Sequence, residues 1–96
     1  MKQHSLKAAV LISGTGSNLK ALIDAVASKR LDLDIVQVVS NRTDAPGINH
    51  ANNAGISVSV ISHSDFPNRE AHDNAVAGVL KESQAELIIL AGYMRI

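Results

Sequence analysis

Hydrophobic positions divide the chain into alternating strand-like and helix-like segments. Residues Ala8–Ile12 and Leu87–Ala91 are continuous apolar runs, which are typical of strands buried on both faces. Asp34–Ser40 is rich in Ile and Val and is predicted to be a further strand. Ile56–Ile61 alternates apolar residues with serines, so one of its faces should be exposed. The pattern therefore predicts four strands, with the first and fourth central in the sheet and the third outermost.

Three segments between these strands have the apolar spacing of helices. Within Asn18–Lys29, apolar residues recur at i, i+3, i+4 and i+7, namely Leu19, Leu22, Ile23 and Val26. Ile48–Ala54 is predicted to be a short helix, which Gly55 would end in a left-handed conformation. Asn68–Ser83 is predicted to be the longest helix. Each predicted strand is thus joined to the next through a helix.

This alternation predicts an α/β fold. Strands joined through helices form a parallel sheet with right-handed crossovers and with helices on both faces. We expect the strand order 3-2-1-4, a Rossmann-like half-fold whose topological switch lies between strands one and four. Residues 1–96 would form one nucleotide-binding part of a domain. Because an apolar fourth strand ends so close to residue 96, we expect this part to be truncated after strand four and to expose an apolar edge.

The composition argues against several classes of partner and of chemistry. The 9 Lys and Arg residues balance the 9 Asp and Glu residues, which disfavours a broad nucleic-acid surface. The chain has no cysteine and hence no disulfide or thiolate chemistry. No apolar run is longer than Leu87–Ala91, which is too short to cross a membrane, and Met1–Lys7 lacks the apolar stretch of a signal peptide. We therefore expect a cytoplasmic protein without a membrane partner.

The turn after the first strand is the most informative segment for function. Ser13–Asn18, with the sequence Ser-Gly-Thr-Gly-Ser-Asn, follows a buried strand and opens a helix. Glycines allow a tight turn, and the amides of Gly16, Ser17 and Asn18 would point at an anion, helped by the helix dipole. Ser17 or Asn18 is the predicted N-cap. A phosphate site is favoured here, and a tight turn without a ligand is the alternative.

A dinucleotide site fits this turn less well. The dinucleotide fingerprint requires a third glycine, and Leu19 occupies that position. It also requires an acidic residue at the end of the second strand, where the chain has Ser40-Asn41-Arg42. Arg42 could suit the 2′-phosphate of NADP, but the missing glycine still counts against it. A P-loop is excluded because no Gly-Lys-Ser/Thr follows.

The histidines give no sign of a metal site or of catalysis. His4, His50, His63 and His72 lack metal-ligand spacing and have no adjacent nucleophile. We expect His50 and His72 on helix surfaces and His63 at the end of the third strand. The carboxylates at the starts of helices are expected to be solvated: Asp65, Glu70 and Asp73.

Four segments together give the chain a specific resemblance. It resembles the glycinamide ribonucleotide transformylases, or phosphoribosylglycinamide formyltransferases, from Ala8 to Ile96 in unbroken order. The segments that carry the resemblance are Leu11–Leu19, Ser40–Asn41, Arg69–Glu70 and Leu90–Ile96. The Gly-Ser-Asn-Leu element joined to the Ala-Gly-Tyr-Met-Arg-Ile ending makes the match strong.

The resemblance implies a function, two ligands and a set of site residues. It implies formyl transfer from 10-formyltetrahydrofolate to the amine of glycinamide ribonucleotide, in purine synthesis. The substrate phosphate would be held by Gly16, Ser17 and Asn18. The folate would be bound in part by Arg69, Met94, Arg95 and Ile96. The family's catalytic asparagine, histidine and aspartate lie beyond the fourth strand, so no residue of this chain inherits a catalytic role.

Two alternatives to this function remain open at this point. Formyltetrahydrofolate deformylase and methionyl-tRNA formyltransferase share the half-fold, although retention of Gly16, Ser17 and Asn18 favours a small phosphate-bearing substrate, and the zero net charge disfavours tRNA. A nucleotide-binding half-domain without catalysis of its own is the other alternative.

Overall fold

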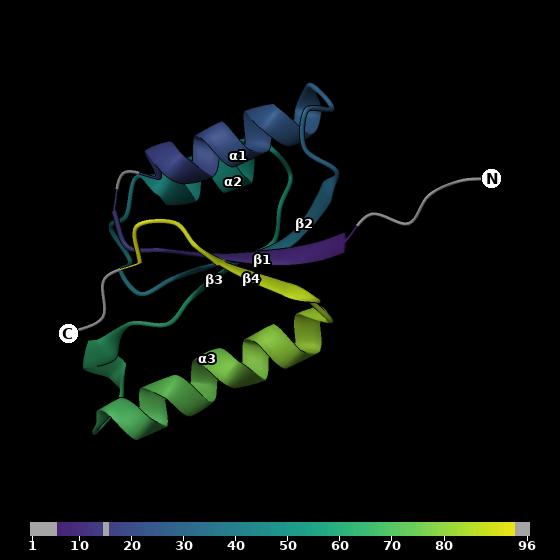
Figure 1. The fold of residues 1–96 in the computed structure, drawn as a ribbon. Coiled ribbons are helices and arrows are strands. Elements are labelled where there is room, and N and C mark those ends of the chain that lie inside the picture. Colours follow the sequence, from purple (N-terminus) through teal and green to yellow (C-terminus); the bar gives the residue numbers. More distant parts are fainter. Residues whose placement is uncertain (1–5, 15, 94–96) are drawn as a thin grey trace.

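The computed structural model describes residues 6–14 and 16–93, which form a layered α/β unit (Figure 1). The elements in chain order are β1 (Leu6–Ile12), α1 (Ser17–Ala27), β2 (Leu33–Ser40), α2 (Gly47–Asn53), β3 (Val58–Val60), the 3₁₀ turn η1 (His63–Asp65), α3 (Arg69–Ser83) and β4 (Leu87–Leu90).

The strands form one parallel sheet in the order β3-β2-β1-β4, which confirms the predicted topology. Helices α1 and α2 cover one face of the sheet and α3 covers the other (Figure 1). The chain leaves β1 toward β2 on one side and receives β4 on the other, so the topological switch lies between β1 and β4 as expected. The carboxyl ends of all strands meet at one edge, and the turns that could bind a ligand gather there.

The core consists of two apolar layers separated by the sheet. The larger layer, under α1 and α2, is built on Val10, Ile12, Leu19, Ile35, Val38, Ala51 and Ala91. The smaller layer, under α3, is built on Leu11, Val39, Ile61 and Val76. Successive residues of β1 enter opposite layers because side chains alternate along a strand. That alternation explains why the buried part of β1, Ala8–Ile12, is apolar without interruption.

The third strand is shorter than the sequence predicts. It spans Val58–Val60 rather than Ile56–Ile61. The amide of Ile56 donates to the carbonyl of Ala51 at 2.9 Å, so this residue completes the end of α2 instead of entering the sheet. Gly55 has φ +73° and reverses the chain between the two elements, as predicted. The strand lies at the sheet edge and is half-exposed, which also confirms the prediction.

The edge formed by β4 is apolar and open to solvent. β4 pairs with β1 on one side, and Leu87, Ile88 and Leu90 are 38%, 43% and 66% exposed. Such an edge offers unpaired backbone groups and apolar side chains to another molecule. The expected exposed apolar edge is therefore present in the structure.

We expect the 96-residue chain to self-associate as its concentration rises. Leu90→Lys should shift the population toward monomer, because a charge on an edge strand opposes strand-to-strand pairing. Asn74→Lys is the matched control, since it adds the same charge at an exposed position of α3. Sedimentation equilibrium over a concentration series measures the effect. A wild-type chain that stays monomeric at the highest concentration would contradict this expectation.

Candidate functional site: the turns at the carboxyl ends of the strands

The turn after β1 enters helix α1 directly through Gly16. Gly16 has φ +76° and ψ +21° and occupies the N-cap position, and its carbonyl accepts the amide of Lys20 at 2.8 Å. The predicted N-cap, Ser17 or Asn18, is therefore wrong by one or two residues. The left-handed conformation of Gly16 turns the chain sharply enough that both residues already lie in the first turn of the helix.

The first turn of α1 leaves its backbone amides available to a ligand. Within the described residues, no side chain caps this helix, and its first turn contains no acidic residue. The first amides of a helix have no partner inside it and carry the positive end of the helix dipole. Ser17 and Asn18, the first two residues of this helix, are exposed. This arrangement suits an anion such as a phosphate.

A second glycine, at the start of α2, contacts this turn. Gly47, the first residue of α2, donates its amide to the carbonyl of Gly14 at 3.1 Å. A Cβ atom placed on Gly16 would lie 2.4 Å from the Cα of Gly47 and 3.3 Å from Cδ2 of His50. Gly16 is therefore packed backbone to backbone against α2, with the His50 ring beside it.

The end of β2 is tied to the end of β1 and to its own following loop. The amide of Asn41 donates to the carbonyl of Ile12 at 3.3 Å. The buried hydroxyl of Ser40 donates to the carbonyl of Arg42 at 2.7 Å and accepts the amide of Arg42 at 3.2 Å. These bonds fix the loop after β2 beside the turn between β1 and α1, residues 13–18, which we call the glycine turn.

An exposed ion pair follows in the same loop. The Arg42 guanidinium donates to both carboxylate oxygens of Asp44, from Nε at 3.1 Å and from a terminal nitrogen at 3.0 Å. The hydrogen bond from Arg42, followed by its charge, lowers the pKa of Asp44 below the usual value. The guanidinium that an NADP site would need is thus engaged by Asp44.

Arg69 begins α3 on the opposite face of the sheet from α1, at the same edge (Figure 1). Asn68 caps this helix by accepting the amide of Ala71 at 2.8 Å. The Arg69 side chain is exposed. The other predicted folate residues, Met94, Arg95 and Ile96, lie outside the described residues, so the folate assignment stays a prediction.

His72 is buried, contrary to the expectation that it lies on a helix surface. It is 1% exposed, and its Nε2 lies 2.8 Å from the carbonyl oxygen of Ile61. Since a carbonyl can only accept, Nε2 carries the proton in this bond. The ring of Phe66 meets the imidazole edge-on at 5.6 Å between centroids. His72 precedes Val76 by one helical turn, and this spacing is the sequence signal that would have placed it on the buried stripe.

For the other histidines and the carboxylates at helix starts, the structure confirms some of the expected positions and corrects others. His50 is half-buried on α2 rather than on an open surface, because it packs beside Gly16. His63 opens η1, since β3 ends at Val60. Asp65 and Glu70 are exposed as predicted, whereas Asp73 is half-buried. Among residues 6–14 and 16–93, no cluster of three or more His, Asp or Glu side chains could hold a metal ion.

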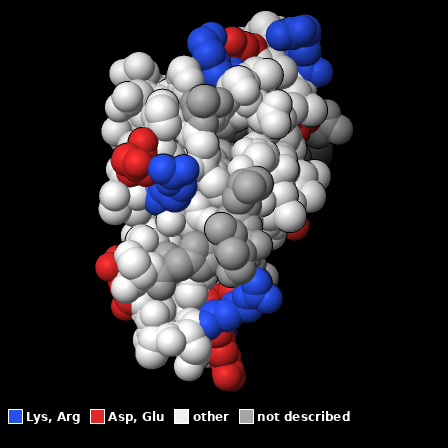
Figure 2. All heavy atoms as spheres, turned by 90° about the vertical axis from the view of Figure 1, so that its left-hand side faces the viewer, with Lys and Arg blue, Asp and Glu red and all other residues white. Residues whose placement is uncertain are grey.

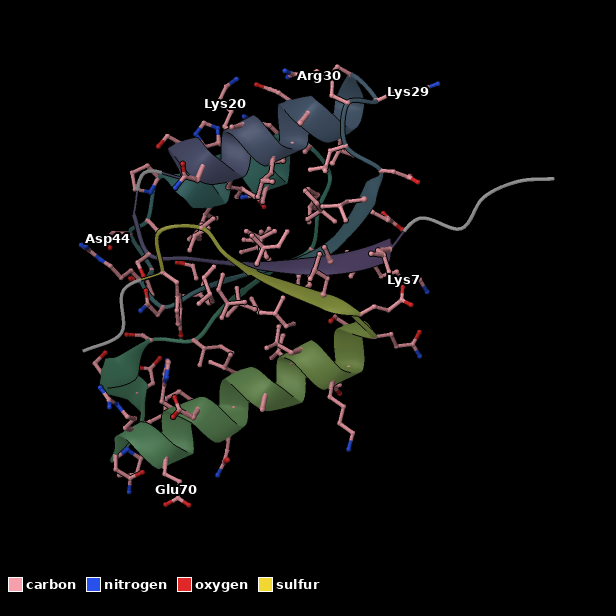
Figure 3. All side chains as sticks on the ribbon, viewed as in Figure 1. Lys7, Lys20, Lys29, Arg30, Asp44 and Glu70 are labelled. Carbon is pink, nitrogen blue, oxygen red and sulfur yellow. The ribbon has the colours of Figure 1, made fainter. Side chains whose placement is uncertain are left out.

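Charged side chains of the described residues lie in separate places on the face that carries these turns (Figure 2). Figure 2 views that face and shows charged side chains toward α1 and toward α3, with one adjoining basic and acidic pair between them. In Figure 3, Asp44 lies at this edge, Lys7 lies at the opposite end of the sheet, and Lys20 points outward from α1. Lys20 is paired with Asp24 at 2.9 Å. Among the described residues, the side chains of Lys20 and Arg42 are thus each paired with a carboxylate. Within the described part of the chain, no helix is long and apolar enough to cross a membrane.

Known proteins match the chain in both sequence and structure. The family model described as formyl transferase matches residues 6–96. The chain is 46% identical over 98 residues to the trifunctional purine biosynthetic protein adenosine-3 of Drosophila melanogaster, covering all of this chain and 7% of that protein. It is 40% identical to the phosphoribosylglycinamide formyltransferase of Escherichia coli K12, covering 91% of this chain and 41% of that enzyme.

Solved structures agree with the sequence matches. Glycinamide ribonucleotide transformylase 1 from Symbiobacterium toebii superimposes with a TM-score of 0.92 at 37% identity, covering 99% of this chain and 45% of that one. A formyltetrahydrofolate deformylase from Pseudomonas putida superimposes with a TM-score of 0.87 at 29% identity, covering 97% of this chain and 32% of that one. The chain thus spans less than half the length of these four relatives. Sequence and fold lead to the same conclusion: this chain belongs to the formyl transferase family.

Proposed function

We propose that this chain is the phosphate-binding front part of an enzyme that transfers a formyl group from 10-formyltetrahydrofolate to the amine of glycinamide ribonucleotide. The observation that carries the proposal is the glycine turn between β1 and α1, which places the first residues of α1 at the topological switch of the sheet. Membership of the formyl transferase family supports the reaction type. The names of two relatives, a phosphoribosylglycinamide formyltransferase and a glycinamide ribonucleotide transformylase, support the acceptor.

In this proposal, the amides of Gly16, Ser17 and Asn18 hold the ribonucleotide phosphate. Arg69, Met94, Arg95 and Ile96 contribute to the folate pocket. The substrate amine attacks the formyl carbon, which creates a tetrahedral oxyanion and requires the loss of a proton from the amine. We assign neither of these two tasks to a residue of this chain, whose contribution is to orient the substrate. We place the reaction in the cytoplasm and expect no nucleic-acid or membrane partner, in keeping with the net charge of +0.

The isolated chain is expected to bind glycinamide ribonucleotide without formylating it. Titration with the ribonucleotide should shift the ¹H–¹⁵N amide signals of Ser17 and Asn18 in a saturable way, because the phosphate would bond to these groups. A formylation assay with 10-formyltetrahydrofolate should stay at background. Transfer above background by the pure chain would show that the active site has been misplaced.

Deformylation of formyltetrahydrofolate is the second candidate, because a deformylase shares the fold at a TM-score of 0.87. The two functions differ in the acceptor of the formyl group, which is water in the deformylase. The same titration distinguishes them. A folded chain whose turn amides do not respond to the ribonucleotide would favour the deformylase and remove the proposed acceptor.

A further inference from the structure

The glycine turn and helix α2 meet through two glycines that come from distant parts of the chain. A Cβ atom on Gly47 would lie 2.8 Å from the Cα of Gly16 and 2.8 Å from Cδ1 of Ile12. Real Cβ atoms essentially never approach other heavy atoms below 3.0 Å. Any side chain at position 47 would therefore force α2 and the turn apart or displace Ile12.

The local backbone does not require a glycine at this position. Positive φ angles occur at Gly16, Gly55 and Gly92 among the described glycines, but not at Gly47. Gly47 is the first residue of α2 and follows Pro46, in a helical turn that most residues can adopt. The absence of a side chain at position 47 therefore serves the tertiary contact with Gly16.

We infer, on the basis of the phosphate site proposed above, that Gly47 is a positioning residue for the phosphate-binding turn. Its missing side chain sets the distance between α2 and Gly16, and its amide holds the carbonyl of Gly14. Together these contacts fix the directions of the amides that follow Gly16. Hydrogen bonds to a phosphate depend steeply on distance and angle, so a small displacement of the turn weakens them.

The test uses the 96-residue chain with inorganic phosphate as the probe. The amide shifts of Ser17 and Asn18 report binding at the turn itself. In the wild type they should follow a saturable curve. In Gly47→Ala the dissociation constant for phosphate should rise by about tenfold or more, as expected when hydrogen bonds to a charged partner are weakened. Wild-type affinity in Gly47→Ala would overturn the inference.

Two further variants separate positioning from general loss of stability. Gly55→Ala strains the backbone at φ +73° at the other end of α2, where a Cβ would meet no atom within 4 Å. Its melting temperature should fall while its phosphate affinity stays at the wild-type value. In the double variant Ile12→Val/Gly47→Ala, loss of the Ile12 Cδ1 atom removes one clash and leaves the clash with Gly16. This variant should fold better than Gly47→Ala and still bind phosphate weakly.

The outcomes distinguish failure of this inference from failure of the phosphate site. Wild-type affinity in the double variant would overturn the positioning role, because the effect of Gly47 would then come from the core alone. A phosphate affinity in Gly55→Ala that falls as far as in Gly47→Ala would also overturn it. The absence of a saturable shift in the folded wild type would refute the phosphate site itself, and the positioning role with it.

Discussion

Replacing Gly16 with valine should abolish phosphate binding to the turn. The new Cβ would lie 2.4 Å from the Cα of Gly47, and backbone atoms cannot rotate away as a side chain can. Valine is also strained at φ +76°, a conformation that β-branched residues almost never adopt. Both effects displace the amides of Ser17 and Asn18, which we propose as phosphate ligands. We therefore expect no saturable amide shifts with phosphate or with the ribonucleotide.

The matched control for this change is Gly78→Val. Gly78 lies in α3, has no positive φ, and a Cβ there would meet no atom within 4 Å. Phosphate affinity in this variant should equal that of the wild type. Ser17→Ala should weaken binding far less than Gly16→Val, by about 0.5–1.5 kcal/mol, if its hydroxyl adds one hydrogen bond to the phosphate.

In an enzyme with the proposed function, Gly16→Val should raise the KM for the ribonucleotide and leave the affinity for folate nearly unchanged. Loss of folate binding with retention of ribonucleotide binding would show that the turn faces the other ligand. Equal loss of both, together with loss of the native spectrum, would indicate a turn that serves folding alone.

Truncation of Leu19 to alanine should cause a large loss in the free energy of unfolding. Leu19 is fully buried and packs in the core layer beneath α1, next to the glycine turn. Leu→Ala changes at such positions cost about 2–5 kcal/mol, through lost transfer free energy and the cavity left behind. Since a domain of ordinary stability unfolds with about 5–15 kcal/mol, Leu19→Ala should remove a large share of the total.

Leu6→Ala makes the same chemical change at an exposed site and serves as the control. Leu6 is 48% exposed at the start of β1, so its truncation should cost much less than that of Leu19. Urea unfolding followed by circular dichroism gives both free energies, and an unchanged slope with denaturant would support direct comparison. Similar losses for the two variants would contradict the assignment of Leu19 to the core.

The order and type of the main elements could be predicted from the sequence because they depend on local patterns. The apolar run of β1 and the helical spacing in α1 identify those elements without knowledge of their neighbours. The parallel sheet and its order then follow from the alternation of strands with crossover helices. The shortening of β3 could not be predicted from local patterns. The amide of Ile56 could bond either to a neighbouring strand or to the end of α2, and packing in the folded chain decides that it bonds to α2.

Some features of the candidate site could likewise be predicted from the sequence, and others depend on the fold. The Gly-Thr-Gly-Ser-Asn string is local and predicts a turn between a strand and a helix, whereas its role in binding phosphate stays a prediction. The predicted N-cap is wrong because serine and asparagine are common caps, and only the backbone angle of Gly16 excludes them. The expectation that His72 lies on a helix surface is wrong. Its burial depends on the carbonyl of Ile61, which the fold brings within 2.8 Å.

Local patterns were sufficient to predict the alternation of strands with helices and the position of the glycine turn, because each depends on residues that are close together along the chain. By contrast, the contact between Gly47 and Gly16 and the burial of His72 are visible only in the folded chain. Both contacts join residues that are distant in the sequence, and no local pattern encodes a distance between two elements. The contact between Gly16 and Gly47 depends on the packing of α2 against the turn after β1. The burial of His72 depends on the packing of α3 against the residue that follows β3, Ile61.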